Sequence, residues 1–175
     1  MGVGKVIGKQ LNNGFPGSFA IQPDMLIASR LNVDTSEIIF GDLCMYKSDM
    51  SGVEHCNENN QVNIGTHFAG IATRIVKQSD KWNDQSNVGY NPKESVSVFQ
   101  RGMISILCVE GKPTLNGKVY YRYKTNDADA KPIGFTAQED ANADTKTILI
   151  SQLVFAGEAD TSGIVAVSIN EKHNA

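Results

Sequence analysis

The chain has 175 residues, of which 41% are hydrophobic and 20% are charged, a composition typical of one ordinary globular domain. Sixteen Lys and Arg side chains against nineteen Asp and Glu give a net charge of -3, without a basic run, which excludes nucleic acid as the main ligand. No apolar stretch approaches the roughly 20 residues that a membrane helix needs, and no signal peptide opens the chain, so we expect no membrane partner and synthesis in a cytoplasm.

The first nineteen residues have the composition least able to fold on its own. Five of the chain's sixteen glycines lie within residues 1–17, and glycine loses more backbone freedom on ordering than any other residue. We predict an extended arm over residues 1–19, whose first eighteen residues reach roughly 60 Å at about 3.3 Å per residue. The apolar side chains that we expect to contact another protein from this arm are Val6, Ile7, Leu11, Phe15 and Phe19. A strand completing the chain's own sheet is the alternative.

The body, predicted over residues 20–170, begins with two apolar runs, Met25 to Leu31 and Glu37 to Tyr46. Turn-forming residues separate them, and Gly41-Asp42 interrupts the second run. We predict that these two runs form paired strands.

Residues 68–77 form the next apolar run, in which Gly70 permits a bulge, and a helix is the alternative. Residues 79–92 are polar and predict a long exposed loop. Loops of this length are usually functional or disordered, and Trp82 and Tyr90 in this loop are candidates for contact with another subunit. The alternative for Trp82 is that it folds back on its own sheet.

Ser95 to Glu110 is the most strand-like stretch, and it is predicted to lie near the centre of the sheet with a bend or bulge at Gly102. A tyrosine-rich strand follows at Lys118 to Lys124. Thr147 to Ala156 and Gly163 to Ile169 then predict a closing hairpin.

Residues 126–144 are either a surface excursion or contain a strand around Ile133 to Thr136. The last residues, 171–175, form a polar tail. About eight strand candidates with regular turn signals and no convincing amphipathic helix predict an all-β fold, an antiparallel β-barrel or β-sandwich with an extended N-terminal arm.

The three cysteines, Cys44, Cys56 and Cys108, have the wide spacing of buried thiols and match neither a disulfide framework nor a paired metal motif. A zinc site built from His55, Cys56 and His67 is the alternative. Adjacent residues of a strand point to opposite faces, which makes joint ligation by His55 and Cys56 awkward.

The sequence does not match the known motifs for catalysis or cofactor binding that we compared with it. The glycines before Lys9 fit no phosphate-binding loop, and the acidic residues 140–144 lack the glycine and glutamate of a calcium loop. The sequence has no GxSxG or HExxH motif. We therefore expect no enzyme, no cofactor and no metal.

Four segments carry a resemblance to a known family. They read GKVIGKQLNNGFPGSFAIQPD, HFAGIATRIVK, YNPKESVSVFQRGMISILC and NGKVYYR, and they follow one another in this order over roughly residues 2–124. Together they resemble the structural cement proteins of tailed bacteriophages, which decorate the outside of a capsid.

The resemblance implies a β-rich capsid decoration protein on the outer surface of the virion. It also implies a homotrimer that binds the major capsid protein and staples the shell, after synthesis in the host cytoplasm. Two other classes stay open: another virion component, such as a tail or head-tail joining protein, and a carbohydrate-binding module that stacks sugars on Trp82 or Tyr90.

Overall fold

The computed structural model describes residues 13–75, 89–125, 131–142 and 145–169, with the side chains of residues 21–23 not described. Five strands close into a barrel, because each pairs with its neighbour and the last returns to the first. In order around the ring they are β7 (Ser95–Glu110), β11 (Ile164–Ile169), β10 (Thr147–Phe155), β8 (Lys118–Arg122) and β9 (Gly134–Thr136). All these pairs are antiparallel except β7 with β9. The fold is therefore all-β, and of the two predicted architectures it is the barrel.

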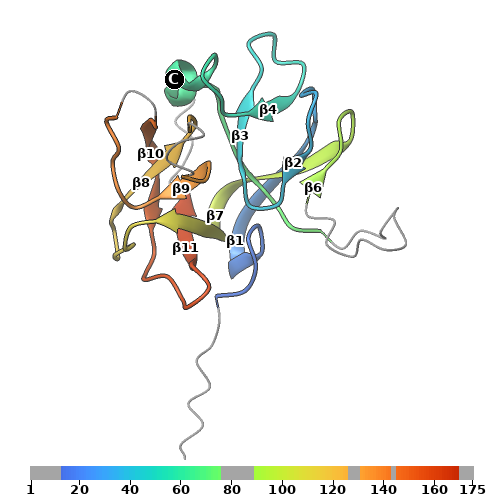
Figure 1. The fold of residues 1–175 in the computed structure, drawn as a ribbon. Coiled ribbons are helices and arrows are strands. Elements are labelled where there is room, and N and C mark those ends of the chain that lie inside the picture. The colour runs from blue at the N-terminus through green and yellow to red at the C-terminus, as the bar shows by residue number, and fades with distance from the viewer. Residues whose placement is uncertain (1–12, 76–88, 126–130, 143–144, 170–175) are drawn as a thin grey trace, which may run out of the picture.

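Strand β7 is long enough to leave the barrel and organise a second group of strands, and it runs between the two groups in Figure 1. The second group contains β1 (Phe19–Leu31), β3 (Leu43–Tyr46), β4 (Val53–His55) and β5 (Phe68–Ala72), together with the small sheet of β2 (Ile38–Ile39) and β6 (Gly89–Tyr90). Strands β1 and β5 both pair with β7, and β3 joins β5 to β4. The helical turns η1 (Gln61–Asn63) and α1 (Ile64–His67) precede β5, and no described helix has the length and hydropathy to cross a membrane.

Two buried clusters form the core. The larger one fills the barrel and continues onto one face of β3 and β5, while the smaller one packs between the opposite face and the β2–β6 sheet. Alternation along β3 separates them, because Leu43 and Met45 enter the larger cluster and Cys44 enters the smaller one. All three cysteines are free and buried, as predicted.

The bend predicted at Gly102 is confirmed. Gly102 has a φ of 108°, and a Cβ there would lie 2.2 Å from the carbonyl oxygen of Asp24 on β1. The pairing of β1 with β7 shifts register in this region. Only glycine permits this close crossing of the two strands without strain.

Strands β7 and β8 and the β10–β11 hairpin form where the sequence predicted strands, and β9 corresponds to the strand that was one of two alternatives around Ile133 to Thr136. The predicted pairing of the first two runs is wrong. Strand β1 pairs with β7, whereas the second run breaks at Gly41, with a φ of 82°, into β2 and β3. The reason is the length of the available ladder: β1 pairs with β7 from Phe19 to Leu31, whereas β3 has only four residues to offer.

Candidate functional site

The described end of the predicted arm, residues 13–18, is fastened to the protein's own body. The Gly17 amide donates to the carbonyl of Ser105 at 2.8 Å, and the Gly17 carbonyl accepts from Arg74 N–H at 2.7 Å. The Asn13 side chain donates to the carbonyl of Ile164 at 2.8 Å, and Ser105 Oγ donates to the Asn13 carbonyl at 2.7 Å. The prediction of a free arm up to residue 19 is therefore wrong over residues 13–18, because these residues satisfy hydrogen bonds of β7 and β11.

Two of the predicted contact residues lie on this fastened segment and its junction with β1. Phe15 is 63% exposed and packs under the Arg74 guanidinium, whose Cζ lies 4.9 Å from the ring centroid. Phe19 is 37% exposed and rests on Phe99 with ring centroids 5.7 Å apart. Both phenyl rings are held in place and remain accessible to another protein.

Strand β1 carries further exposed apolar residues that sequence reasoning did not single out. They are Met25 at 37%, Leu26 at 52%, Ile27 at 38% and Leu31 at 46% exposure, and we call them, with Phe19, the β1 apolar edge. Among the described residues β1 pairs with β7 alone, so its other edge is open. A long open edge with exposed apolar side chains is a surface that proteins normally cover with a partner. The signal was visible as three consecutive apolar residues, Met25 to Ile27.

The prediction that Tyr90 is an exposed contact residue is wrong. Tyr90 lies in β6, is fully buried, and donates its hydroxyl hydrogen to the carbonyl of Thr73 at 2.8 Å. Its ring packs edge-on against Phe40 with centroids 5.2 Å apart. The other candidates, Val6, Ile7, Leu11 and Trp82, lie outside the described residues.

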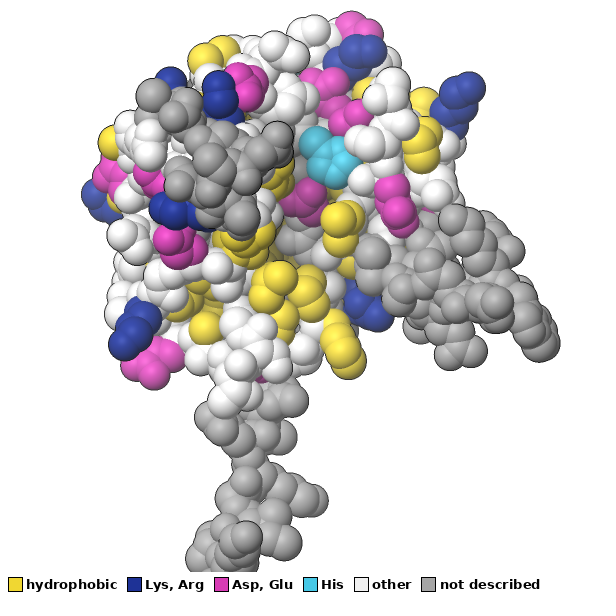
Figure 2. Space-filling view, viewed as in Figure 1, with side chains coloured by type: hydrophobic (Ala, Val, Ile, Leu, Met, Phe, Trp, Pro, Cys, Tyr) yellow, Lys and Arg dark blue, Asp and Glu magenta, His cyan; other side chains and the backbone are white. Residues whose placement is uncertain are grey.

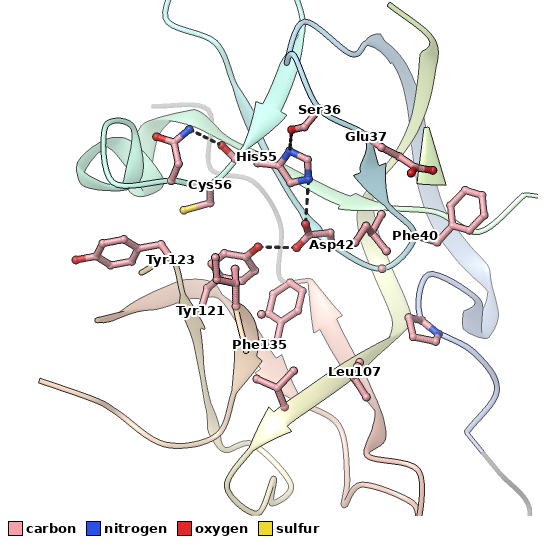
Figure 3. A pocket seen from close by; sticks show the side chains of 17 residues that line it. Ser36, Glu37, Phe40, Asp42, His55, Cys56, Leu107, Tyr121, Tyr123 and Phe135 are labelled. Atoms are coloured by element: carbon pink, nitrogen blue, oxygen red, sulfur yellow. Dashed lines mark hydrogen bonds and ion pairs between the residues drawn. The ribbon is translucent and has the colours of Figure 1, made fainter. Parts of the chain in front are cut away.

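A pocket of about 490 Å³ lies between the barrel and the segment from β2 to β4. Figure 2 shows hydrophobic side chains gathered around a hollow beneath a histidine. On the barrel side the lining comes from β7, β8 and β9, and on the other side from the turn before β3 and the end of β4. The labelled residues of this lining in Figure 3 are Ser36, Glu37, Phe40, Asp42, His55, Cys56, Leu107, Tyr121, Tyr123 and Phe135.

A chain of polar groups runs beside the pocket, and His55, Asp42 and Tyr121 of this chain line it. His55 Nδ1 lies 3.0 Å from Asp34 Oδ2, and His55 Nε2 lies 3.4 Å from Asp42 Oδ2. Tyr121 reaches across from β8 and donates its hydroxyl hydrogen to Asp42 Oδ1 at 2.6 Å, so the tyrosine and histidine converge on one carboxylate (Figure 3). These contacts tie the barrel to β4, and the linked residues are too far apart in sequence to be paired by spacing.

Burial and hydrogen bonding act on these groups in different directions. Burial opposes ionisation of Asp34, but hydrogen bonds and charge from His55 outweigh it and lower the pKa of Asp34 to about 2. Burial raises the pKa of Asp42 despite the nearby His55 and Tyr121, and burial beside Asp42 raises the pKa of Tyr121 well above its ordinary value. Burial also raises the pKa of Cys56 to about 12, so its thiol stays protonated and is a poor nucleophile at neutral pH.

The alternative of a zinc site at His55, Cys56 and His67 has no geometric support. The His55 ring is engaged by the two aspartates, and His67 Nδ1 lies 2.8 Å from the hydroxyl of neighbouring Thr66. Within the part of the chain that the structure describes, no three His, Cys, Asp or Glu side chains are arranged to hold a metal ion.

Replacing Asp34 with Asn is expected to lower the free energy of unfolding by about 1–2 kcal/mol near pH 7. The folded pKa of Asp34, about 2, lies below its ordinary 3.8, so its stabilisation is present above the ordinary pKa and is lost as pH falls toward 2. The difference between wild type and Asp34→Asn, measured by urea unfolding, should therefore shrink with falling pH. Glu139→Gln, at an exposed carboxylate, is the control and should show no such trend. A difference that stays constant with pH would contradict the role of the Asp34 charge.

Comparison with known families matches residues 3–170 to the family described as structural cement protein (E217 gp24/Pam3 gp6). The chain belongs to the structural cement protein family. This confirms the resemblance predicted from residues 2–124 and extends it to the C-terminal part of the barrel. No curated protein matches the cement protein.

Four chains of solved structures match the cement protein. One, from the capsid of Myoviridae phage XM1, has a TM-score of 0.65 at 14% identity, with 97% of this chain and 98% of that chain covered. At this identity the likeness establishes a shared fold over nearly the whole length. Membership of this family identifies the cement protein as a structural protein of a phage capsid.

Proposed function

We propose that the cement protein binds the outer surface of the phage shell, with the major capsid protein as its partner, and stabilises the shell as a homotrimer without enzymatic activity. The β1 apolar edge carries this proposal. Its side chains are 37% to 52% exposed, they lie on one strand, and that strand has an open edge. A capsid surface that covers this edge removes apolar area from water and pairs its backbone groups.

Phe15 and Phe19 extend the proposed contact surface to the start of β1, where hydrogen bonds hold the backbone in position. Prepositioned aromatic rings lose little conformational freedom on binding, which makes them suitable anchors. A trimer multiplies the attachment, because once one copy is bound the others bind at high effective concentration. Such multivalent bridging between capsid subunits is what resists outward pressure from a packaged genome.

Particles that lack the cement protein are expected to release their genome at a lower temperature than complete particles. The reason is that a bound cement trimer stabilises only the intact shell, so its binding free energy adds to the barrier against opening. The measurement is the dye-detected release of DNA during heating, with and without purified protein added back. Equal release temperatures for bare and decorated particles would contradict a stabilising role.

A further inference from the structure

The pocket between the barrel and β4 has an open apolar rim. Ile39, Leu107 and Ile133 line it and are 50%, 41% and 52% exposed, respectively. Large apolar side chains grouped around a hollow mark a binding groove more often than isolated exposed ones do. The rim belongs to β2, β7 and the segment before β9, so it is distinct from the β1 apolar edge.

The pocket is also acidic. Its lining includes the carboxylates of Glu37 and Asp42, with His55 beside Asp42, and no Lys or Arg side chain among the residues that the structure describes. The matching ligand is therefore an apolar segment that carries positive charge.

Residues 1–12 of this chain have that composition. They include Lys5 and Lys9 and no acidic residue. Their aliphatic side chains belong to Val3, Val6, Ile7 and Leu11. Twelve residues reach about 40 Å at roughly 3.3 Å each, which is enough to cross from one protomer to a neighbour in a compact trimer.

The point where this segment leaves the body favours a neighbour's pocket over its own. Pro16 lines the pocket of its own protomer, but three residues earlier the Asn13 amide donates to Asp160 Oδ2 at 2.9 Å. The Asn13 side-chain amide also donates a hydrogen bond to the carbonyl of Ile164. Neither Asp160 nor Ile164 lines the pocket. The chain has thus left its own pocket by residue 13, where contacts with Asp160 and Ile164 hold it.

We propose that residues 1–12 of one copy dock in the pocket between barrel and β4 of a second copy, with apolar side chains on the rim and lysines toward the carboxylates. This inference rests on the proposed homotrimer but not on attachment to the shell. In a homotrimer each copy gives its segment to one neighbour and receives one from the other, so the contact is head-to-tail and closes in a ring.

Crosslinking of two mixed single-cysteine variants tests this directly. Full-length Val6→Cys, carrying an affinity tag, is mixed with untagged Ile133→Cys and treated with a short bismaleimide. The heterodimer band is expected at a yield about tenfold or more above that of a mixture with Leu115→Cys, an exposed position outside the pocket. The native cysteines are buried, so they contribute little background.

A double variant Val6→Cys/Ile133→Cys that crosslinks only within one chain would overturn the proposal, and so would a heterodimer yield equal to the Leu115→Cys control. The substitutions Lys5→Glu and Lys9→Glu reverse the charge of the segment and change no residue that the structure describes. They should lower the heterodimer yield at low salt. An unchanged yield would contradict the charge complementarity. A trimer that persists in light scattering while the crosslink is absent would overturn segment docking and leave the proposed function intact.

Discussion

Replacing Arg122 with Met is expected to lower the free energy of unfolding by about 3–5 kcal/mol. The Arg122 side chain is fully buried at the end of β8, yet it carries a charge. Its guanidinium donates to Glu110 Oε2 and to the carbonyl of Pro132, and lies 3.7 Å from Asp140. The hydrogen bond from Arg122 also holds the pKa of Glu110 below its ordinary value.

The loss is large because the substitution removes a fully buried cation whose charge Glu110 and Asp140 balance. Glu110, 32% exposed, would lose its closest cation, and Asp140, 13% exposed, would lose the guanidinium but keep the Lys131 ammonium at 3.0 Å. The arginine also fastens the segment before β9 to the barrel through the carbonyl of Pro132. Removing it therefore weakens the closure of the barrel as well as the charge balance.

Chemical denaturation of the purified protein measures this effect, with Lys124→Met as the matched control. Lys124 lies two residues further along, and its ammonium pairs with Glu58 at 3.2 Å, where the side chains are 33% and 56% exposed. An exposed pair contributes about 0–1 kcal/mol, so the control should lose little. If both variants lose a similar amount of unfolding free energy, burial of the Arg122 ion pairs does not make them more stabilising than an exposed pair.

Introducing Asp at both Leu26 and Leu31 is expected to reduce binding to shells by at least about tenfold, or roughly 1.4 kcal/mol. The two side chains are 52% and 46% exposed, so their replacement leaves the described cores intact. On the shell, however, each new carboxylate would have to lose water against an apolar surface. That cost falls on the bound state alone.

Sedimentation of purified variants with undecorated shells gives the bound fraction. Val62→Asp and Leu115→Asp serve as controls, since both positions are apolar, 71% and 68% exposed, and outside β1. Circular dichroism should show that all variants are folded. If the β1 variant binds as well as the controls do, the β1 apolar edge is not the capsid contact.

The parts of the fold that the sequence predicted are those set by local signals. Alternation located β7, turn residues located the β10–β11 hairpin, and the conformational demands on Gly102 marked the bend. Each of these depends on residues close together in the chain. The pairing of β1 depends instead on which distant strand offers the best ladder, and periodicity contains no information about that choice.

The same distinction applies to the candidate site. Tyr90 stands among polar residues, a pattern that predicts exposure, but the β2–β6 pairing places it in the core. The Tyr121 hydroxyl and Asp42 meet across 79 positions of sequence, and the burial of Arg122 depends on partners in β7 and beyond β9. Polar side chains such as these hold the fold together through long-range contacts, and a single sequence does not reveal those contacts.

A density map of the intact particle, at a resolution that shows side chains, would locate the cement protein and its contact surface on the shell. We expect many copies of the cement protein on the outer face of the shell, with Leu26 and Leu31 of the β1 apolar edge against the major capsid protein. Finding the chain in the tail, or on the shell with β1 facing solvent, would contradict this expectation.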